Sequence, residues 1–360
     1  MALIASAAQG RVATADDVVV SLRPIVAWVP KGQTSGLPAS VPIRELPRNE
    51  DQTAGPRYVK ALAWGAGKDL WFAFDSGIGR IDDARTSPTW TWYVLPRPDG
   101  EDGDTEPEVL APRGPKGRIA VGTVFGSIAV SDGVDPRGLK LHPMQSSEQT
   151  AGIMPWVGWS ASGSIGASMH LSCNVAMLDA KSGADVWRRE ERVARYPASS
   201  FDGRWLLLPW AEADSDAEVL DADTGKTLAR LPRKGADRVY GAIDDIGRFV
   251  VQGRDEEHLS VWEWKSGAVS KMEMESGERP IAMAFVPGTS RCVVASPQAI
   301  SLFDVATRRR MCRWEAKDAG PLGEYVPQSD MSVSADGRLV AVLTERLTVV
   351  VLEIVIEKPR

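Results

Sequence analysis

The sequence is poor in the side chains that most metal sites depend on. Its 360 residues include only three cysteines and three histidines. Cys173, Cys292 and Cys312 form no Cys-x-x-Cys pair, and so few histidines leave no zinc-ligand spacing. We therefore predict that the chain holds no metal. We interpret the cysteines as semi-buried small hydrophobic side chains in a reducing compartment.

Motifs for nucleophilic catalysis and phosphate binding are missing as well. A catalytic triad needs Ser or Cys close to His and an acid, and three histidines offer few combinations. Residues 162–166 are a turn and not a Gly-x-Ser-x-Gly nucleophile elbow, and residues 114–118 lack the spacing of a Walker motif. No dense pocket for a quinone cofactor can be identified. We predict no catalytic residue, no cofactor and no enzymatic activity.

Long apolar runs and long basic runs are also lacking. Nothing approaches 18 consecutive apolar residues, so we predict no membrane span. The N-terminal Met1–Ala5 has neither the basic segment nor the apolar core of a signal peptide. A net charge of −6 without clustered Lys or Arg argues against binding a polyanion. These absences predict a cytoplasmic protein that binds neither membranes nor nucleic acids.

What the sequence does contain is a repeat made of two marks. With 33 glycines, 24 prolines and 13 tryptophans, the composition favours many turns between strands with large aromatic anchors. A turn ending in glycine stands just before an apolar run at Gly67, Gly117, Gly163, Gly203, Gly247, Gly288 and Gly337. Between 15 and 18 residues later, a second apolar run ends on an acid at Asp82, Asp132, Asp179, Asp221, Glu263, Asp304 and Glu353. Steps of 40 to 50 residues with several short strands each are typical of propeller blades.

The repeat predicts an all-β fold, a seven-bladed β-propeller of four-stranded antiparallel blades. The last unit begins at Met331 and has room for only three strands, so a strand from the N-terminal region must complete it. Leu46-Pro47-Arg48 matches the tripeptides that end fourth strands at residues 95–97 and 231–233, and we therefore predict Val41–Leu46 as the closing strand. Residues 1–30 are then surplus and form an extra hairpin or part of an eighth blade, which is the alternative architecture. We divide the chain into an N-terminal segment, 1–57, and the propeller, 58–360, within a single domain.

The hairpins resemble those of the WD40/YVTN-type β-propeller superfamily. Residues 177–183, 219–225 and 302–307 resemble its Trp-Asp-x-x-Thr-Gly hairpin, and residues 334–341 resemble its Ser-x-Asp-Gly-x-x-Leu-Ala turn and second strand. The sequence departs from the family in having no Gly-His dipeptide, and Leu or Phe replaces Trp in most hairpins. The resemblance covers residues 58–356, fits a degenerate, bacterial-style propeller and implies the fold more than any role.

The repeated acids at the ends of third strands admit two interpretations. A ring of Asp179, Asp221 and Asp304 could suggest a repeated metal site. Aspartate at the start of a turn, however, accepts hydrogen bonds from backbone N–H groups two residues on, which stabilises a hairpin. We therefore assign these acids a structural role. The tryptophans on predicted strands, such as Trp71 and Trp262, are expected to pack between blades.

The candidate binding site lies in acidic loops. In propellers of this kind the second-to-third and fourth-to-first connections share one face, here called the loop face. Acids in three such connections form the predicted partner-binding set: Glu101, Asp102, Asp104, Glu106, Glu212, Asp214, Asp216, Asp255, Glu256 and Glu257. Those of the last two connections fall on neighbouring blades and would attract a basic partner. Ordinary solvated loops and a Ca²⁺ site in residues 99–106 are the alternatives.

Together these features predict a non-catalytic interaction scaffold or regulatory subunit. Its partner would be a separately encoded protein with a basic surface. The alternatives are a propeller enzyme and a small-ligand sensor, each with its site at the mouth of the central channel. The lining of that mouth separates them, because convergent His, Arg and carboxylate groups favour an enzyme whereas apolar and acidic surface favours binding.

Overall fold

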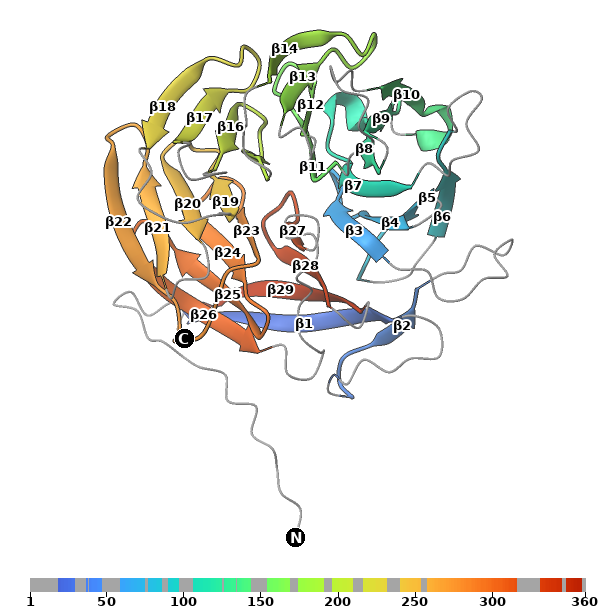
Figure 1. Cartoon of the computed structure of the whole chain (residues 1–360). Helices are drawn as coiled ribbons and strands as arrows, with labels where there is room; N and C mark the ends of the chain where they lie inside the picture. Colours follow the sequence, from blue (N-terminus) through green and yellow to red (C-terminus); the bar gives the residue numbers. More distant parts are fainter. Residues whose placement is uncertain are drawn as a thin grey trace.

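Seven small antiparallel sheets stand around a central axis, which confirms the predicted seven-bladed propeller (Figure 1). This computed structural model describes residues 19–29, 37, 39–46, 59–74, 77–85, 90–96, 106–124, 126–133, 135–143, 154–168, 174–190, 196–209, 216–231, 240–253, 258–315, 331–344 and 348–357. Within those ranges the only helices are two short 3₁₀ turns, η1 (Pro115–Gly117) and η2 (Pro136–Gly138).

Blades 1 to 3 each pair four strands in chain order from the axis outwards. Blade 1 consists of β3 (Val59–Trp64), β4 (Leu70–Phe74), β5 (Gly77–Ile81) and β6 (Trp90–Val94). Blade 2 consists of β7 (Pro107–Ala111), β8 (Ala120–Thr123), β9 (Ser127–Val130) and β10 (Lys140–Pro143). Blade 3 consists of β11 (Trp156–Trp159), β12 (Ile165–Ser168), β13 (Val175–Leu178) and β14 (Asp185–Arg189).

Blades 4 to 6 repeat the arrangement. Blade 4 consists of β15 (Ala198–Ser199), β16 (Trp205–Leu208), β17 (Ala217–Asp221) and β18 (Thr227–Leu231). Blade 5 consists of β19 (Tyr240–Ile243), β20 (Phe249–Gly253), β21 (His258–Glu263) and β22 (Ala268–Glu273). Blade 6 consists of β23 (Ala282–Phe285), β24 (Arg291–Ala295), β25 (Ala299–Asp304) and β26 (Arg309–Glu315). Because strands alternate in direction, the first-to-second and third-to-fourth connections share the face opposite the loop face, called here the turn face.

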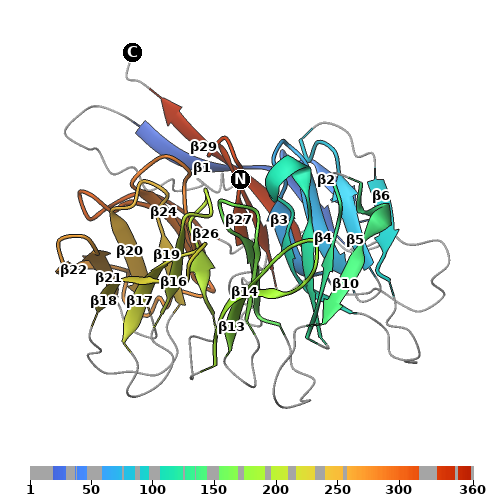
Figure 2. The same cartoon turned by 90° about the horizontal axis from the view of Figure 1, so that it is seen from above.

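Blade 7 is closed by an N-terminal strand, as predicted, but the predicted strand is wrong. It consists of β27 (Met331–Val333), β28 (Leu339–Leu343), β29 (Val349–Glu357) and, as its fourth strand, β1 (Val19–Val29). The predicted closing segment forms only the short β2 (Ile43–Glu45), which adds to β1 in parallel on the outside. The expectation that residues 1–30 are surplus is therefore wrong for 19–29, and residues 1–18 lie outside the described ranges. In Figure 2 the β1–β29 pair extends beyond the turn face, at the top of the view.

Seven clusters of buried apolar side chains hold the described part of the ring together, one in each seam between neighbouring blades. Most second and third strands are buried on both sides, as in β4, β8 and β28. This double burial explains their continuous apolar runs. Trp71 and Trp262 are 1% exposed, which confirms that they pack within the fold. The strand β1 contributes to two seams, with Leu22 facing blade 6 and Trp28 facing blade 1.

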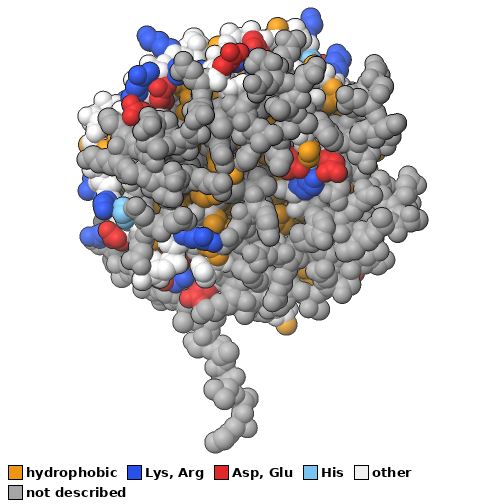
Figure 3. Space-filling model, viewed as in Figure 1, with side chains coloured by type: hydrophobic (Ala, Val, Ile, Leu, Met, Phe, Trp, Pro, Cys, Tyr) orange, Lys and Arg blue, Asp and Glu red, His pale blue; other side chains and the backbone are white. Residues whose placement is uncertain are grey.

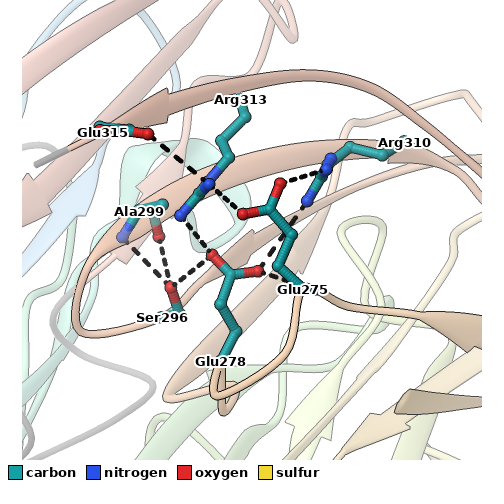
Figure 4. A network of polar contacts seen from close by, with 7 residues as sticks. All are labelled: Glu275, Glu278, Ser296, Ala299, Arg310, Arg313 and Glu315. Atoms are coloured by element: carbon teal, nitrogen blue, oxygen red, sulfur yellow. Dashed lines mark hydrogen bonds and ion pairs between the residues drawn. The ribbon is translucent and has the colours of Figure 1, made fainter. Parts of the chain in front are cut away.

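A polar cluster adds to the seam between blades 5 and 6 (Figure 4). Glu275 and Glu278 lie in the connection from β22 to β23, and Arg310 and Arg313 project from β26. Arg313 donates to Glu275, and its Nη2 lies 2.9 Å from Oε1 of Glu278, a side chain that is nearly fully buried. The two arginines offset the cost of burying the Glu278 carboxylate beside the more exposed Glu275.

The repeated glycines and acids are parts of turns, as predicted. Six of the seven first-mark glycines have positive φ, with Gly67 the exception, and Gly183, Gly225 and Gly267 have positive φ in the third-to-fourth turns. Only glycine adopts this conformation without steric cost. At Gly203 an added Cβ would also lie 2.6 Å from the carbonyl oxygen of Trp159 in the next blade.

Blade 6 breaks this rule, because Arg308 occupies the position that Gly225 takes in blade 4 and has a φ of 59°. Replacing Arg308 by glycine is therefore expected to raise the free energy of unfolding by about 0.5–1 kcal/mol, since relief of the left-handed strain exceeds the entropy that glycine loses. Urea denaturation measures this change. The neighbouring Arg309→Gly is the matched control, because Arg309 lies in a strand with ordinary φ, and it should lower stability. Equal effects of the two substitutions would contradict the explanation.

Candidate functional site

The innermost strands of all seven blades surround a central cavity of about 180 Å³. Its lining comes from β3, β7, β11, β15, β19, β23 and β27 and from residues next to them. Most lining side chains are apolar, among them Trp156, Ile243 and Phe285. Ser332 is one of the polar ones, and its hydroxyl already accepts the backbone N–H of Trp64 at 3.1 Å.

Arg113 is the one charged side chain that lines this cavity within the described ranges. It follows β7, and its Nη1 donates a hydrogen bond to the carbonyl oxygen of Val333 at 3.2 Å. Its guanidinium carbon also lies 4.3 Å from the centre of the Phe201 ring. Burial lowers the pKa of Arg113 to about 10, so the group is charged at neutral pH.

Arg113 reaches across the channel near the turn face. Arg113 and Phe201 lie in the first-to-second connections of blades 2 and 4, and Val333 ends the first strand of blade 7. These three blades are not neighbours, so the contacts span the ring. The guanidinium forms no ion pair with any described carboxylate, which distinguishes it from Arg85, Arg189 and Arg313. Among the described residues, the channel thus carries a positive charge that no carboxylate pairs with, in a mostly apolar surrounding.

Two of the ten predicted partner-binding acids lie in described ranges. Glu106 precedes β7 and is 39% exposed; together with Glu108 it receives hydrogen bonds from Lys60 of β3 at 2.6 and 3.0 Å. Burial works against the charge on Lys60, but these two carboxylates outweigh it and raise the pKa of Lys60. Glu106 therefore forms an ion pair across the seam between blades 1 and 2.

The other described acid, Asp216, is exposed immediately before β17. It lies on blade 4, and Glu106 lies on blade 2, so blade 3 stands between them. The structure confirms that the loops before β17 and β21 belong to neighbouring blades. Glu101, Asp102, Asp104, Glu212, Asp214, Asp255, Glu256 and Glu257 lie outside the described ranges, so the acidic patch stays a prediction.

The repeated acids have the structural role assigned to them. Asp179 accepts the N–H and hydroxyl of Ser182, both at 2.7 Å, and Asp221 accepts the same two groups of Thr224 at 2.9 and 2.7 Å. The bonds from Ser182 hold the pKa of Asp179 below its usual value. Within the described residues, no group of three or more His, Cys, Asp or Glu side chains is placed to hold a metal ion.

The cysteines offer no reactive group in the described part of the chain. Cys292 and Cys312 are buried, and burial raises the pKa of the Cys292 thiol strongly and that of Cys312 to about 12. Cys173 and His170 lie outside the described ranges. No described helix has the length and apolar character needed to cross a membrane.

Arg113 is the residue that sequence reasoning missed. The neighbouring residues 114–118 drew attention only for Gly117 of the repeat and for a Walker motif, whose spacing they lack. Nothing local marks Arg113 as a channel residue, because its neighbours there come from blades 4 and 7. In Figure 3, described hydrophobic side chains are visible towards the middle of the face, and described charged side chains are visible both near the rim and further in.

Comparisons with known proteins support the fold. No protein family matches the sequence, and no curated protein does. Many solved chains share the architecture. One of them belongs to the crystal structure of a mitotic checkpoint complex; it has 12% sequence identity and a TM-score of 0.63, over 86% of this chain and 96% of that one. At this identity the likeness establishes the β-propeller fold, and the resemblance to the WD40/YVTN superfamily remains a prediction.

Proposed function

We propose that this chain is a non-catalytic interaction scaffold or regulatory subunit that binds a protein partner through its loop face. The observation that carries this proposal is the lining of the central channel. Its described side chains are apolar apart from Arg113 and a few small polar groups, which is not the convergence of His, Arg and carboxylate groups that favours an enzyme. A ring held by seven apolar seams is a rigid platform for binding.

The partner of this proposal is a separately encoded cytoplasmic protein with a basic surface. Asp216 belongs to an acidic connection on blade 4, and the similar connection at residues 255–257 lies on blade 5 beside it. Neighbouring acidic loops add their fields, which speeds association with a positively charged surface. The solved chain that shares this fold belongs to the structure of a complex, which is compatible with a binding role.

Reversing the loop-face acids is expected to weaken partner capture strongly. The variant carries Glu212→Lys, Asp214→Lys, Asp255→Lys and Glu256→Lys. Affinity purification of the native complex, followed by quantitative mass spectrometry, measures the partner recovered with each form. Because four charges change sign at one surface, recovery should fall by about tenfold or more and should depend on ionic strength.

The matched control reverses four acids on the opposite face. These acids end third strands or follow them: Asp82, Asp132, Glu263 and Glu357. This variant has the same net charge as the loop-face variant, so a difference between the two folded variants reports position, although Asp82 and Asp132 lose their ion pairs with Arg80 and Lys140. Unchanged recovery with the loop-face variant, or equal loss with both, would contradict the proposal.

A further inference from the structure

We propose that the central channel binds a small organic monocarboxylate with a short apolar body, held by the guanidinium of Arg113. This site is independent of the loop face. It lies in the channel near the turn face, where the first strands of the blades converge, so it can exist whether or not the loop face binds a protein.

The first argument is charge. Placing a guanidinium among apolar side chains is costly unless a partner compensates it. Among the described residues, Arg113 has a backbone carbonyl and an aromatic ring as its partners, and the lowered pKa reflects this cost. Other partly buried arginines of the described fold, such as Arg189 and Arg313, are paired with carboxylates. Within the described part of the chain, Arg113 therefore has no carboxylate partner of the kind that these arginines have.

The second argument is geometry. Nη1 is occupied by the carbonyl of Val333, whereas Nε and Nη2 form no hydrogen bond with a described residue. The side chain lines the cavity and is only half-buried, so its donors remain accessible to a ligand. Two adjacent guanidinium N–H groups match the two oxygens of a carboxylate. The Phe201 ring contacts the guanidinium on one side, and this contact restricts the side chain before a ligand binds.

The third argument is size and lining. An apolar cavity of about 150 Å³ holds benzene in an engineered protein, so about 180 Å³ has room for a short-chain or aromatic acid. Trp156, Ile243 and Phe285 offer apolar contact to its body. One guanidinium balances one negative charge, and no second cation lines the described cavity. A dianion such as phosphate would leave one charge uncompensated, which favours a monoanion.

The test compares sodium benzoate with benzamide by isothermal titration calorimetry on the full chain. Benzamide has nearly the same shape as benzoate but no charge, so it cannot form the charge-assisted pair of hydrogen bonds with Arg113. We therefore expect benzamide to bind at least about tenfold more weakly than benzoate. This comparison uses the wild-type protein alone. Equal affinities for the two ligands, or no benzoate binding at millimolar concentration, would overturn the proposal.

Variants then locate the site. Arg113→Met keeps the length and apolar stem of the side chain and should raise the Kd for benzoate at least about tenfold, removing the preference over benzamide. The control Arg137→Met alters an exposed arginine of the same blade, paired with Asp135 at 2.5 Å, and should leave the Kd unchanged. Benzoate binding that survives in Arg113→Met, or that is lost in Arg137→Met, would show that the carboxylate is held elsewhere.

Discussion

Replacing Trp28 by alanine is expected to lower the free energy of unfolding by about 3–5 kcal/mol. Trp28 lies on β1, is 1% exposed and packs in the seam between blades 7 and 1 with side chains such as Leu70 and Val349. Truncation removes this apolar area and leaves a cavity that a ring fixed on both sides cannot collapse to fill. Because β1 is the strand that closes the ring, the loss weakens the whole propeller.

The matched control for Trp28 lies on β2. Ile43 belongs to the segment first expected to close the ring, but it is 48% exposed and its strand only adds to the outer edge. Ile43→Ala should cost less than about 0.5 kcal/mol, as surface substitutions usually do. Denaturant titrations of the two variants measure both changes. If Ile43→Ala were as costly as Trp28→Ala, ring closure by β1 would be contradicted.

The repeat correctly predicted that an N-terminal strand closes the ring, but the wrong segment was assigned to it. Pro24 explains this error. Proline cannot donate to a sheet ladder, so the run around it reads as two short pieces, 17–22 and 25–29. In the structure the register shifts between Pro24 and Val26, and this irregularity accommodates the proline within one long strand paired to β29. The tripeptide at 46–48 favoured the wrong segment because it matches the ends of fourth strands elsewhere.

Turns and hairpins were predictable because their causes are local. The bonds of Asp221 to Thr224 and the positive φ of Gly225 all lie within five residues, so spacing alone indicated them. For the same reason the sequence predicts strands at 217–221, 227–231, 291–295 and 299–304, and β17, β18, β24 and β25 have these bounds. The channel site was not predictable, because Arg113, Phe201 and Val333 meet only when seven blades close around the axis.

The turn between the first and second strands of blade 5 departs from the repeat, and we expect this departure to lower the free energy of unfolding. In blades 4 and 7 the turn begins with Ser200 and Ser334, each of which donates to the aspartate two residues on, at 2.7 and 2.6 Å. In blade 5 the first position is Asp244, and Ile246 stands where the other turns have aspartate. The carboxylate has thus moved from a surface position to one that is 0% exposed.

One oxygen of the buried Asp244 carboxylate accepts a hydrogen bond from a described residue, and the other does not. Oδ1 of Asp244 accepts the N–H of Arg248 at 2.9 Å, whereas Oδ2 has no hydrogen-bond partner among the described residues. Burial raises the pKa of Asp244 to about 6, although backbone hydrogen bonds oppose the change, and the neighbouring Asp245 adds to it. The ordinary value of 3.8 applies to the unfolded chain, so unfolding favours the charged form.

We expect Asp244→Ser to raise the free energy of unfolding by up to about 3 kcal/mol at pH 7–8. The difference between about 6 in the fold and 3.8 in the unfolded chain corresponds to this free energy. The folded pKa lies above the unfolded one, so the penalty is absent below pH 3.8, grows as the pH rises to 6 and is complete above it. Wild-type stability should therefore fall between pH 4 and 6, and the variant should lack that fall. Denaturant titrations across this range measure it.

Asp179→Ser provides a control of opposite sign. Hydrogen bonds from Ser182 hold the pKa of Asp179 below its usual value, so its contribution to stability is present above pH 4 and is lost as the pH falls. This variant should lose stability at neutral pH and approach the wild type in acid. If Asp244→Ser and Asp179→Ser changed stability in the same direction, or if the Asp244→Ser effect were independent of pH, burial of an ionised Asp244 could not be the cause. If only Asp244→Ser raises the free energy of unfolding, and only above pH 6, the ionised Asp244 carboxylate is the cause of the lower stability of the blade 5 turn.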